Sequence, residues 1–190
     1  NAERIQHDPL NAQASQDKID IQIAAGDFAA ARATINEERR RFGDHPSLRE
    51  RDVALAVVSG DRNQLLELFR EMQELPRDYG SAAALRAALR GDIDEAKALL
   101  EQTRSLHGIP LWAIWTMLEL GDEEQVAELV HDIDATQAGH VNLALTYAVG
   151  GKLLWFDLDD TPNFKQRLQE AGVDIESMPR GRWPSASPGS

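Results

Sequence analysis

One short cluster of imidazole and carboxylate side chains has the residue types that bind metal ions in proteins. His131, Asp132 and Asp134 lie close together near the expected end of a helix. Zinc ligands on a helix usually stand three or four positions apart, which lets two side chains reach the same ion. The three side chains of this cluster do not all lie on one face of the helix. We therefore expect exposed polar residues here and no metal site.

Nucleophilic and phosphate-binding motifs are missing from the sequence. Because the chain has no cysteine, thiol nucleophiles, thiolate zinc sites and disulfides are excluded. The sequence contains neither a glycine-rich phosphate loop nor a Gly-x-Ser-x-Gly nucleophile elbow. These absences favour a protein without a cofactor.

A stronger candidate for catalysis is the run Leu153–Thr161, which reads Leu-Leu-Trp-Phe-Asp-Leu-Asp-Asp-Thr. It resembles the first motif of phosphatases of the haloacid dehalogenase type, in which an apolar strand ends at Asp-x-Asp. The resemblance implies that Asp157 attacks phosphorus and that Asp159 is the general acid and base. It also implies that magnesium neutralises the phosphate charge.

The rest of the chain does not complete this phosphatase site. The family needs a parallel sheet whose later strands supply a Thr or Ser, a Lys and a second acidic pair, but only 29 residues follow Thr161. Helical patterns precede the motif instead of alternating strands and helices. We therefore expect no enzyme. Leu153–Phe156 would belong to the core, and Asp160 or Thr161 would cap the helix that begins at Pro162.

The elements that must carry any site are helices separated by regular Gly-Asp pairs. The pairs begin at Gly26, Gly60, Gly91 and Gly121, a fifth bend has Gly151-Lys152, and the spacings are 34, 31, 30 and 30 residues. Glycine supplies the left-handed conformation that ends a helix, and aspartate can cap the next one. We expect helices near residues 10–25, 27–42, 46–58, 61–74, 78–90, 92–106, 110–120, 122–134, 138–149 and 162–171.

The bends resemble those of tetratricopeptide repeats, in which Gly-Asp is followed by an apolar residue and then a small one. Gly26–Ala31 and Gly91–Ala96 match this pattern, and the resemblance covers about residues 8–156. It implies an all-α fold, an α-α superhelix (solenoid) of about five helical hairpins with a C-terminal capping helix. The closing segment also resembles the end of repeat domains that follow bacterial transcription regulators or nucleotide cyclases.

The resemblance also implies a binding groove, because the first helix of each hairpin lines the concave surface in that family. With the bend glycines as the register, the concave positions are Leu85, Leu89, Trp115, Leu118 and Glu119. The helix 110–120 is apolar nearly all round, which is typical of a buried helix or one that faces a partner. Both core packing and a groove role remain open for Trp115.

Charge restricts the kinds of partner. The formal net charge of −12 argues against nucleic acid, which needs clustered Lys and Arg. No Lys or Arg occurs between Arg104 and Lys152, a stretch with seven acidic residues that is either a solvated helix face or a docking surface for a basic segment. No apolar run approaches the ~20 residues of a membrane span. The partner we expect is a protein or peptide with a basic segment.

Domain boundaries follow from composition. Residues 1–175 are predicted to form the repeat domain, and residues 176–190, rich in Pro, Gly and Ser, a disordered tail in which Trp183 is unexpected. Ile19, Ile21 and Ile23 at the first repeat predict a contact with a second copy or a missing domain.

The function we expect is a non-catalytic protein- or peptide-binding scaffold. The alternative is a sensory or regulatory C-terminal domain of a bacterial transcription regulator or nucleotide cyclase. The sequence specifies no compartment.

Overall fold

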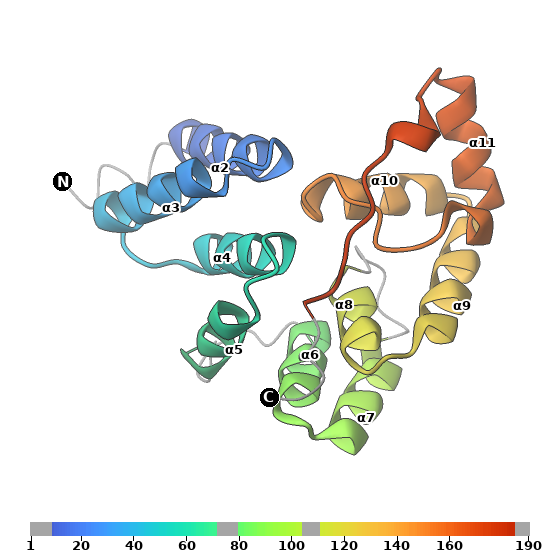
Figure 1. The fold of residues 1–190 in the computed structure, drawn as a ribbon, viewed down its shortest axis with the longest axis horizontal. Coiled ribbons are helices and arrows are strands. Elements are labelled where there is room, and N and C mark those ends of the chain that lie inside the picture. Colours follow the sequence, from blue (N-terminus) through green and yellow to red (C-terminus); the bar gives the residue numbers. More distant parts are fainter. Residues whose placement is uncertain (1–8, 72–79, 104–110, 185–190) are drawn as a thin grey trace. The chain divides into compact units, whose positions relative to one another are not determined.

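Helices make up most of the part of the chain that the computed structural model describes, residues 9–71, 80–103 and 111–184 (Figure 1). Within these ranges no strand is present, and the all-α prediction is confirmed. All ten expected helices are found. They are α2 (Pro9–Ala24), α3 (Phe28–Phe42), α4 (Pro46–Val58), α5 (Arg62–Glu71), α6 (Gly80–Arg90), α7 (Ile93–Thr103), α8 (Leu111–Glu119), α9 (Glu123–Asp134), α10 (Gly139–Val149) and α11 (Pro162–Glu170), with 3-10 turns η2 (Leu158–Asp160) and η3 (Ile175–Ser177).

The Gly-Asp bends have the geometry that the sequence predicts. Gly26 has a φ of +73°, which favours glycine, and the N–H of Asp27 donates to the Gln22 carbonyl at 2.9 Å, closing helix α2. The Asp27 carboxylate then accepts from the Ala30 N–H at 3.1 Å and caps α3. Asp61 and Asp122 cap α5 and α9 in the same way, at 3.0 and 3.2 Å.

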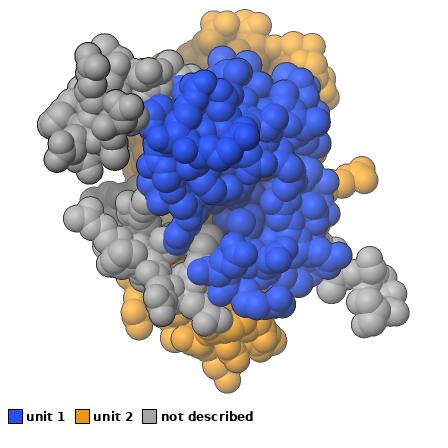
Figure 2. Space-filling view, turned by 90° about the vertical axis from the view of Figure 1, so that its left-hand side faces the viewer, with its two compact units in different colours: residues 1–75, 186–190 blue, residues 76–185 orange. Residues whose placement is uncertain are grey.

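The chain divides into two compact units, residues 1–75 with 186–190 and residues 76–185, coloured separately in Figure 2. In unit 1, α2 packs against α3 and α4, and α4 packs against α3 and α5. In unit 2, α6 packs against α7 and α8, and the contacts then run from α8 to α9, from α9 to α10 and from both of these to α11. The prediction of one repeat domain over residues 1–175 stays a prediction.

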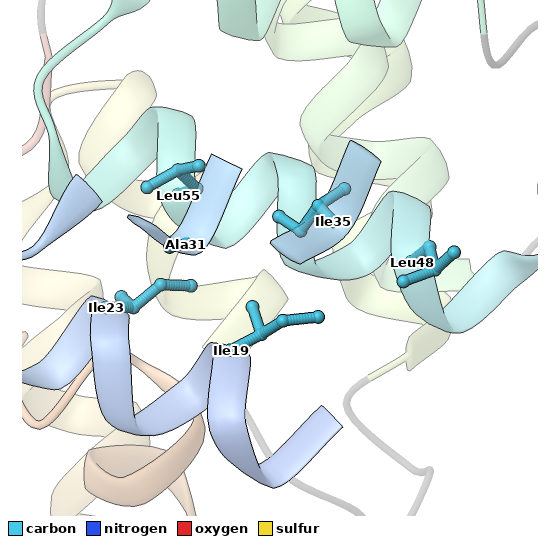
Figure 3. Packing of buried hydrophobic residues seen from close by; sticks show 6 residues of the cluster. All are labelled: Ile19, Ile23, Ala31, Ile35, Leu48 and Leu55. Carbon is cyan, nitrogen blue, oxygen red and sulfur yellow. The ribbon is translucent and has the colours of Figure 1, made fainter. Parts of the chain in front are cut away.

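The core of unit 1 is aliphatic (Figure 3). Residues spaced three, four or seven positions apart face the same side of each helix, so α2, α3 and α4 each contribute a stripe. The buried members are Ile19, Ile23, Ala31, Ile35, Leu48 and Leu55. Of the three isoleucines expected at an open end, Ile19 and Ile23 are therefore used by this core, whereas Ile21 is 63% exposed.

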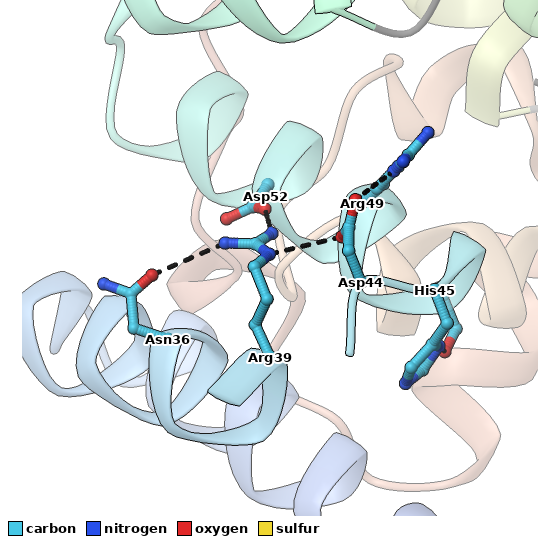
Figure 4. A network of polar contacts seen from close by, with 7 residues as sticks. Asn36, Arg39, Asp44, His45, Arg49 and Asp52 are labelled. Carbon is cyan, nitrogen blue, oxygen red and sulfur yellow. Dashed lines mark hydrogen bonds and ion pairs between the residues drawn. The ribbon is translucent and has the colours of Figure 1, made fainter. Parts of the chain in front are cut away.

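A polar network ties the end of α3 to α4 in unit 1 (Figure 4). The Arg39 guanidinium pairs with the buried Asp52 carboxylate and donates to Asp44 at 3.2 Å, and Arg49 donates to the other oxygen of Asp44 at 2.6 Å. Burial raises the pKa of Asp52, although Arg39 acts against that shift. Partial burial also acts to raise the pKa of Asp44, but the hydrogen bonds from its two arginines outweigh it and lower the pKa.

The last helix of unit 2 is capped from another helix. Asp134, at the end of α9, is only 3% exposed, and its two carboxylate oxygens accept the N–H groups of Asn163 and Phe164, both at 2.8 Å. The expectation that Asp160 or Thr161 caps α11 is wrong, because Thr161 stands at the cap position without a side-chain bond to the helix. A carboxylate brought in by packing satisfies the free N–H groups instead.

Candidate functional site

Four tryptophans, all the tryptophans of the chain, gather in unit 2 around the ring of Trp115. Trp112 and Trp155 meet Trp115 edge-on, with ring centroids 5.4 and 5.7 Å away and interplanar angles of 80°. Trp183 lies against it at 6.2 Å and 41°. Edge-to-face pairs are the favoured geometry for aromatic rings, so the cluster is well packed.

Three different kinds of element position these rings. Trp112 and Trp115 stand one helical turn apart on α8, which places them side by side. Trp155 follows α10, is buried, and its indole N–H donates to the Gly150 carbonyl at 2.9 Å. Trp183 belongs to the extended segment after η3, which Figure 1 draws in red, running from α11 back past α10.

This C-terminal segment, residues 178–184, pairs with the chain through its backbone. The N–H of Leu154 donates to the Pro179 carbonyl at 2.9 Å, and the N–H of Gly181 donates to the Leu154 carbonyl at 2.8 Å. Together the two bonds make a parallel bridge between Leu154 and Arg180. Composition predicted disorder from residue 176, whereas the structure places residues 176–184 along unit 2; residues 185–190 lie outside the described ranges.

Arg180 reaches the loop that contains the Asp-x-Asp motif. Its guanidinium donates to the Phe156 carbonyl at 3.1 Å and to the Asp157 carboxylate at 3.4 Å. The pKa of Asp157 is lowered, chiefly because its carboxylate accepts the Asp159 N–H and also because Arg180 is near. A cationic side chain is thus held at the rim of an acidic unit.

Trp183 is the anchor of the segment. Its indole N–H donates to the Glu119 carboxylate at 2.6 Å, and its ring packs on Trp115. A hydrogen bond to a charged acceptor is stronger than one between neutral groups. Pro184, the next residue, is buried.

The five residues predicted to line a groove differ in whether they contact the C-terminal segment and in how far they are buried. Trp115 and Glu119 both meet Trp183. Trp115 itself is 1% exposed with Trp183 packed against it, and Leu85 is completely buried. Leu89 and Leu118 are half-buried.

The other candidates for chemistry lie elsewhere. Asp157 and Asp159 are exposed and pair with Arg180 and Lys165, whose Nζ is 2.6 Å from Asp159. Leu154, Trp155 and Phe156 are buried, as expected of a core segment. Among the described residues no group of three or more histidine and acidic side chains could hold a metal ion. Over the same ranges no helix has the length and apolarity to cross a membrane.

Sequence reasoning missed the backbone pairing between Leu154 and Gly181. A signal for the segment was present in Trp183, an aromatic residue in a stretch whose composition otherwise indicates disorder. No sequence pattern marks Leu154, because its contribution comes from main-chain groups that every residue has.

Comparison of the chain with protein-family models, with curated proteins and with solved structures finds no match.

Proposed function

We propose that unit 2 is a non-catalytic peptide-binding module that takes up an extended, basic segment of a partner protein. The observation that carries the proposal is the seating of the chain's own residues 179–184, with Trp183 on Trp115 and Glu119. We call the residues under this segment, Trp115, Glu119, Leu154 and Trp155, the docking surface.

The docking surface combines two known ways of binding a peptide. The backbone of Leu154 offers one donor and one acceptor, as the edge of a sheet does when an extended peptide adds to it. Tryptophan rings beside it supply the apolar anchor, and tryptophan is enriched where interfaces concentrate their binding energy. Backbone pairing gives affinity for any extended chain, and the rings give preference for an aromatic side chain.

The charge of unit 2 supports a basic partner segment. No Lys or Arg occurs between Arg104 and Lys152, and Glu119, Glu123 and Glu124 are among the acidic residues there. Arg180 of the chain's own segment pairs with another acidic residue of the unit, Asp157. Charge complementarity speeds encounter and selects among partners more than it adds affinity.

Helical hairpins of the tetratricopeptide type remain our proposal for the frame. In each unit a helix packs against both the next helix and the one after it, α2 against α3 and α4, and α6 against α7 and α8. That contact pattern is what stacked hairpins produce. The superhelix of about five hairpins is likewise a proposal.

The experiment is a selection of peptides from a random displayed library against the full chain and its Glu119→Lys variant. We expect peptides with an aromatic residue to be enriched by the wild type and lost with Glu119→Lys. Glu123→Lys makes the same charge change at an exposed position of α9 and should leave the selection unchanged. Substitutions at Leu85 or Trp115 are unsuitable, because both side chains are buried and their replacement would disturb folding. A selection with no dependence on Glu119 would exclude the proposal.

A regulatory domain of a larger signalling protein is the second candidate. The observation that favours it is the occupation of the docking surface by the chain's own segment, since such a surface has an occupied and a vacant state. A ligand that binds only the vacant state would shift the balance between the two.

A further inference from the structure

We infer that the docking surface recognises the pattern Arg-Gly-x-Trp-Pro in an extended partner segment, and that residues 180–184 are a replaceable occupant of the same site. This inference rests on the proposed function and names the chemistry of its ligand. Each position of the pattern follows from what the corresponding residue of the chain contacts.

The glycine position is the most restrictive. A Cβ atom added to Gly181 would lie 2.6 to 2.8 Å from three atoms of the Trp155 ring system. Trp155 cannot easily yield, because it is buried, packs on Trp115 and donates to Gly150. Only glycine lets the backbone approach this ring closely enough to pair with Leu154.

The two positions beside the glycine both carry arginine, and they differ in what the side chain contacts. Arg180 donates to the Phe156 carbonyl and the Asp157 carboxylate, which favours arginine over lysine because one guanidinium serves both acceptors. Arg182 is exposed, and the position after the glycine is therefore open to other residues.

The tryptophan and proline positions supply the apolar contact. The ring of Trp183 packs against Trp115 at a tilt of 41°, and its N–H donates to Glu119. Phenylalanine could make the ring contact but has no N–H to donate. Pro184 is buried and has no N–H that would need a partner.

The chain's own segment fits this surface imperfectly. Glu176, Ser177, Pro179, Arg180 and Arg182 are exposed, so the segment lies on the unit rather than inside it. The indole Nε1 of Trp115, although buried, has no hydrogen-bond acceptor in the described part of the chain. An unpaired buried donor is unfavourable, and a partner segment that offers an acceptor there would bind better than residues 180–184 do.

Tethering explains how an imperfect segment still occupies the site. A segment on the same chain has an effective concentration in the millimolar range, so it competes strongly with free peptide. A free ligand then binds with an affinity reduced by the fraction of vacant sites. Weakening the tethered segment should therefore strengthen binding of the same sequence added as a separate peptide.

The test is fluorescence anisotropy with a labelled peptide of residues 177–184, titrated with the full chain. We expect the Trp183→Ala variant to bind this peptide about tenfold or more tightly than the wild type does. Peptides with Gly181→Ala or Trp183→Ala should bind each protein at least about fivefold more weakly than the parent peptide does, and a peptide with Arg182→Ala should bind like the parent. Adding Glu119→Lys to Trp183→Ala should abolish binding.

Gly181→Val provides a second way to empty the site without removing a tryptophan, and circular dichroism checks that each variant keeps its helices. The inference is overturned if a folded variant fails to bind the peptide, or if the Gly181→Ala peptide binds as well as the parent. It is also overturned if both variants lose their helices, since the segment would then be part of the core. Glu119-dependent library peptides unrelated to this pattern would leave the proposed function standing while excluding the pattern.

Discussion

Unit 1 and unit 2 begin with the same helical pattern but end differently. Both contain Gly-Asp bends and a helix that packs on its two successors, as α2 and α6 do. Unit 1 has an aliphatic core and a network of Arg39 with two carboxylates, whereas unit 2 contains all four tryptophans and an extended segment paired with Leu154. The difference teaches that the proposed docking surface forms where segments after α10 pack back against α8.

The reason is that a hairpin repeat uses its side chains for packing against its neighbours. In unit 1 the apolar side chains at helical spacing, such as Ile23 and Ile35, are buried against the neighbouring helices. After α10 the spacing ends, and Trp155 and Trp183 come from non-helical segments. These segments pack instead around Trp115, where the backbone of Leu154 pairs with Pro179 and Gly181 and the Glu119 carboxylate accepts from Trp183.

The substitution with the largest expected effect tests whether the two units unfold independently. Ile35→Ala removes a fully buried side chain from the core of unit 1 and should lower its free energy of unfolding by about 2 to 5 kcal/mol. Hydrogen exchange of α2 to α4 should accelerate while that of α8 to α11 stays unchanged. Ile21→Ala, at an exposed position, is the control. Equal acceleration in α8 to α11 would show that the units unfold together.

A second substitution tests the tertiary cap of unit 2. Asp134→Ala leaves the N–H groups of Asn163 and Phe164 without their acceptor and should cost about 2 kcal/mol. Faster exchange should appear in α11 first. Asp132→Ala, an exposed neighbour on the same helix, should have no such effect. Unchanged protection of α11 in the Asp134→Ala protein would contradict the capping role.

A third substitution addresses the segment that unit 1 lacks. Gly181→Ala places a methyl group against Trp155 and should weaken the docked state by about 1 to 3 kcal/mol. Tryptophan fluorescence should shift to longer wavelength as Trp183 leaves Trp115 for water. The matched control is Arg182→Ala, whose side chain is exposed. If both variants keep the wild-type spectrum, the close contact with Trp155 does not hold the segment.

The smallest expected effect is on how stability depends on pH, and it is tested with one carboxylate from each unit, Asp52 and Asp157. The pKa of Asp52 is raised by burial, so the folded state binds its proton more tightly and this contribution to stability is lost as the pH rises above about 4. The pKa of Asp157 is lowered, first by the Asp159 N–H, so its contribution is lost as the pH falls below about 4.

Replacing each carboxylate by an amide should therefore change the pH dependence of unfolding in opposite directions. Denaturant unfolding between pH 3 and 6 is the measurement. Asp52→Asn should make stability rise more steeply with pH than in the wild type, and Asp157→Asn should make it rise less steeply. A change of the same sign in both variants would refute the contrast between a buried and an exposed carboxylate.

Local physics explains why so much of the helical frame could be predicted. A left-handed glycine and a capping aspartate act within about four residues, so Gly26 and Asp27 specify a bend whatever lies elsewhere in the chain. Apolar spacing such as Ile19 and Ile23 likewise indicates which face of a helix is buried. The helices and bends were therefore readable from the residues alone.

Contacts between residues far apart in the sequence could not be predicted and are known only from the tertiary structure. Asp134 caps α11 from 29 and 30 positions away, and Trp183 reaches Glu119 across 64. Composition around Trp183 indicates disorder, yet backbone pairing with Leu154 and packing of the Trp183 ring on Trp115 hold the segment in place. Such pairs depend on where packing brings two segments together. The residue types alone do not specify them, because an aspartate, glutamate or tryptophan can equally face solvent or make a different contact.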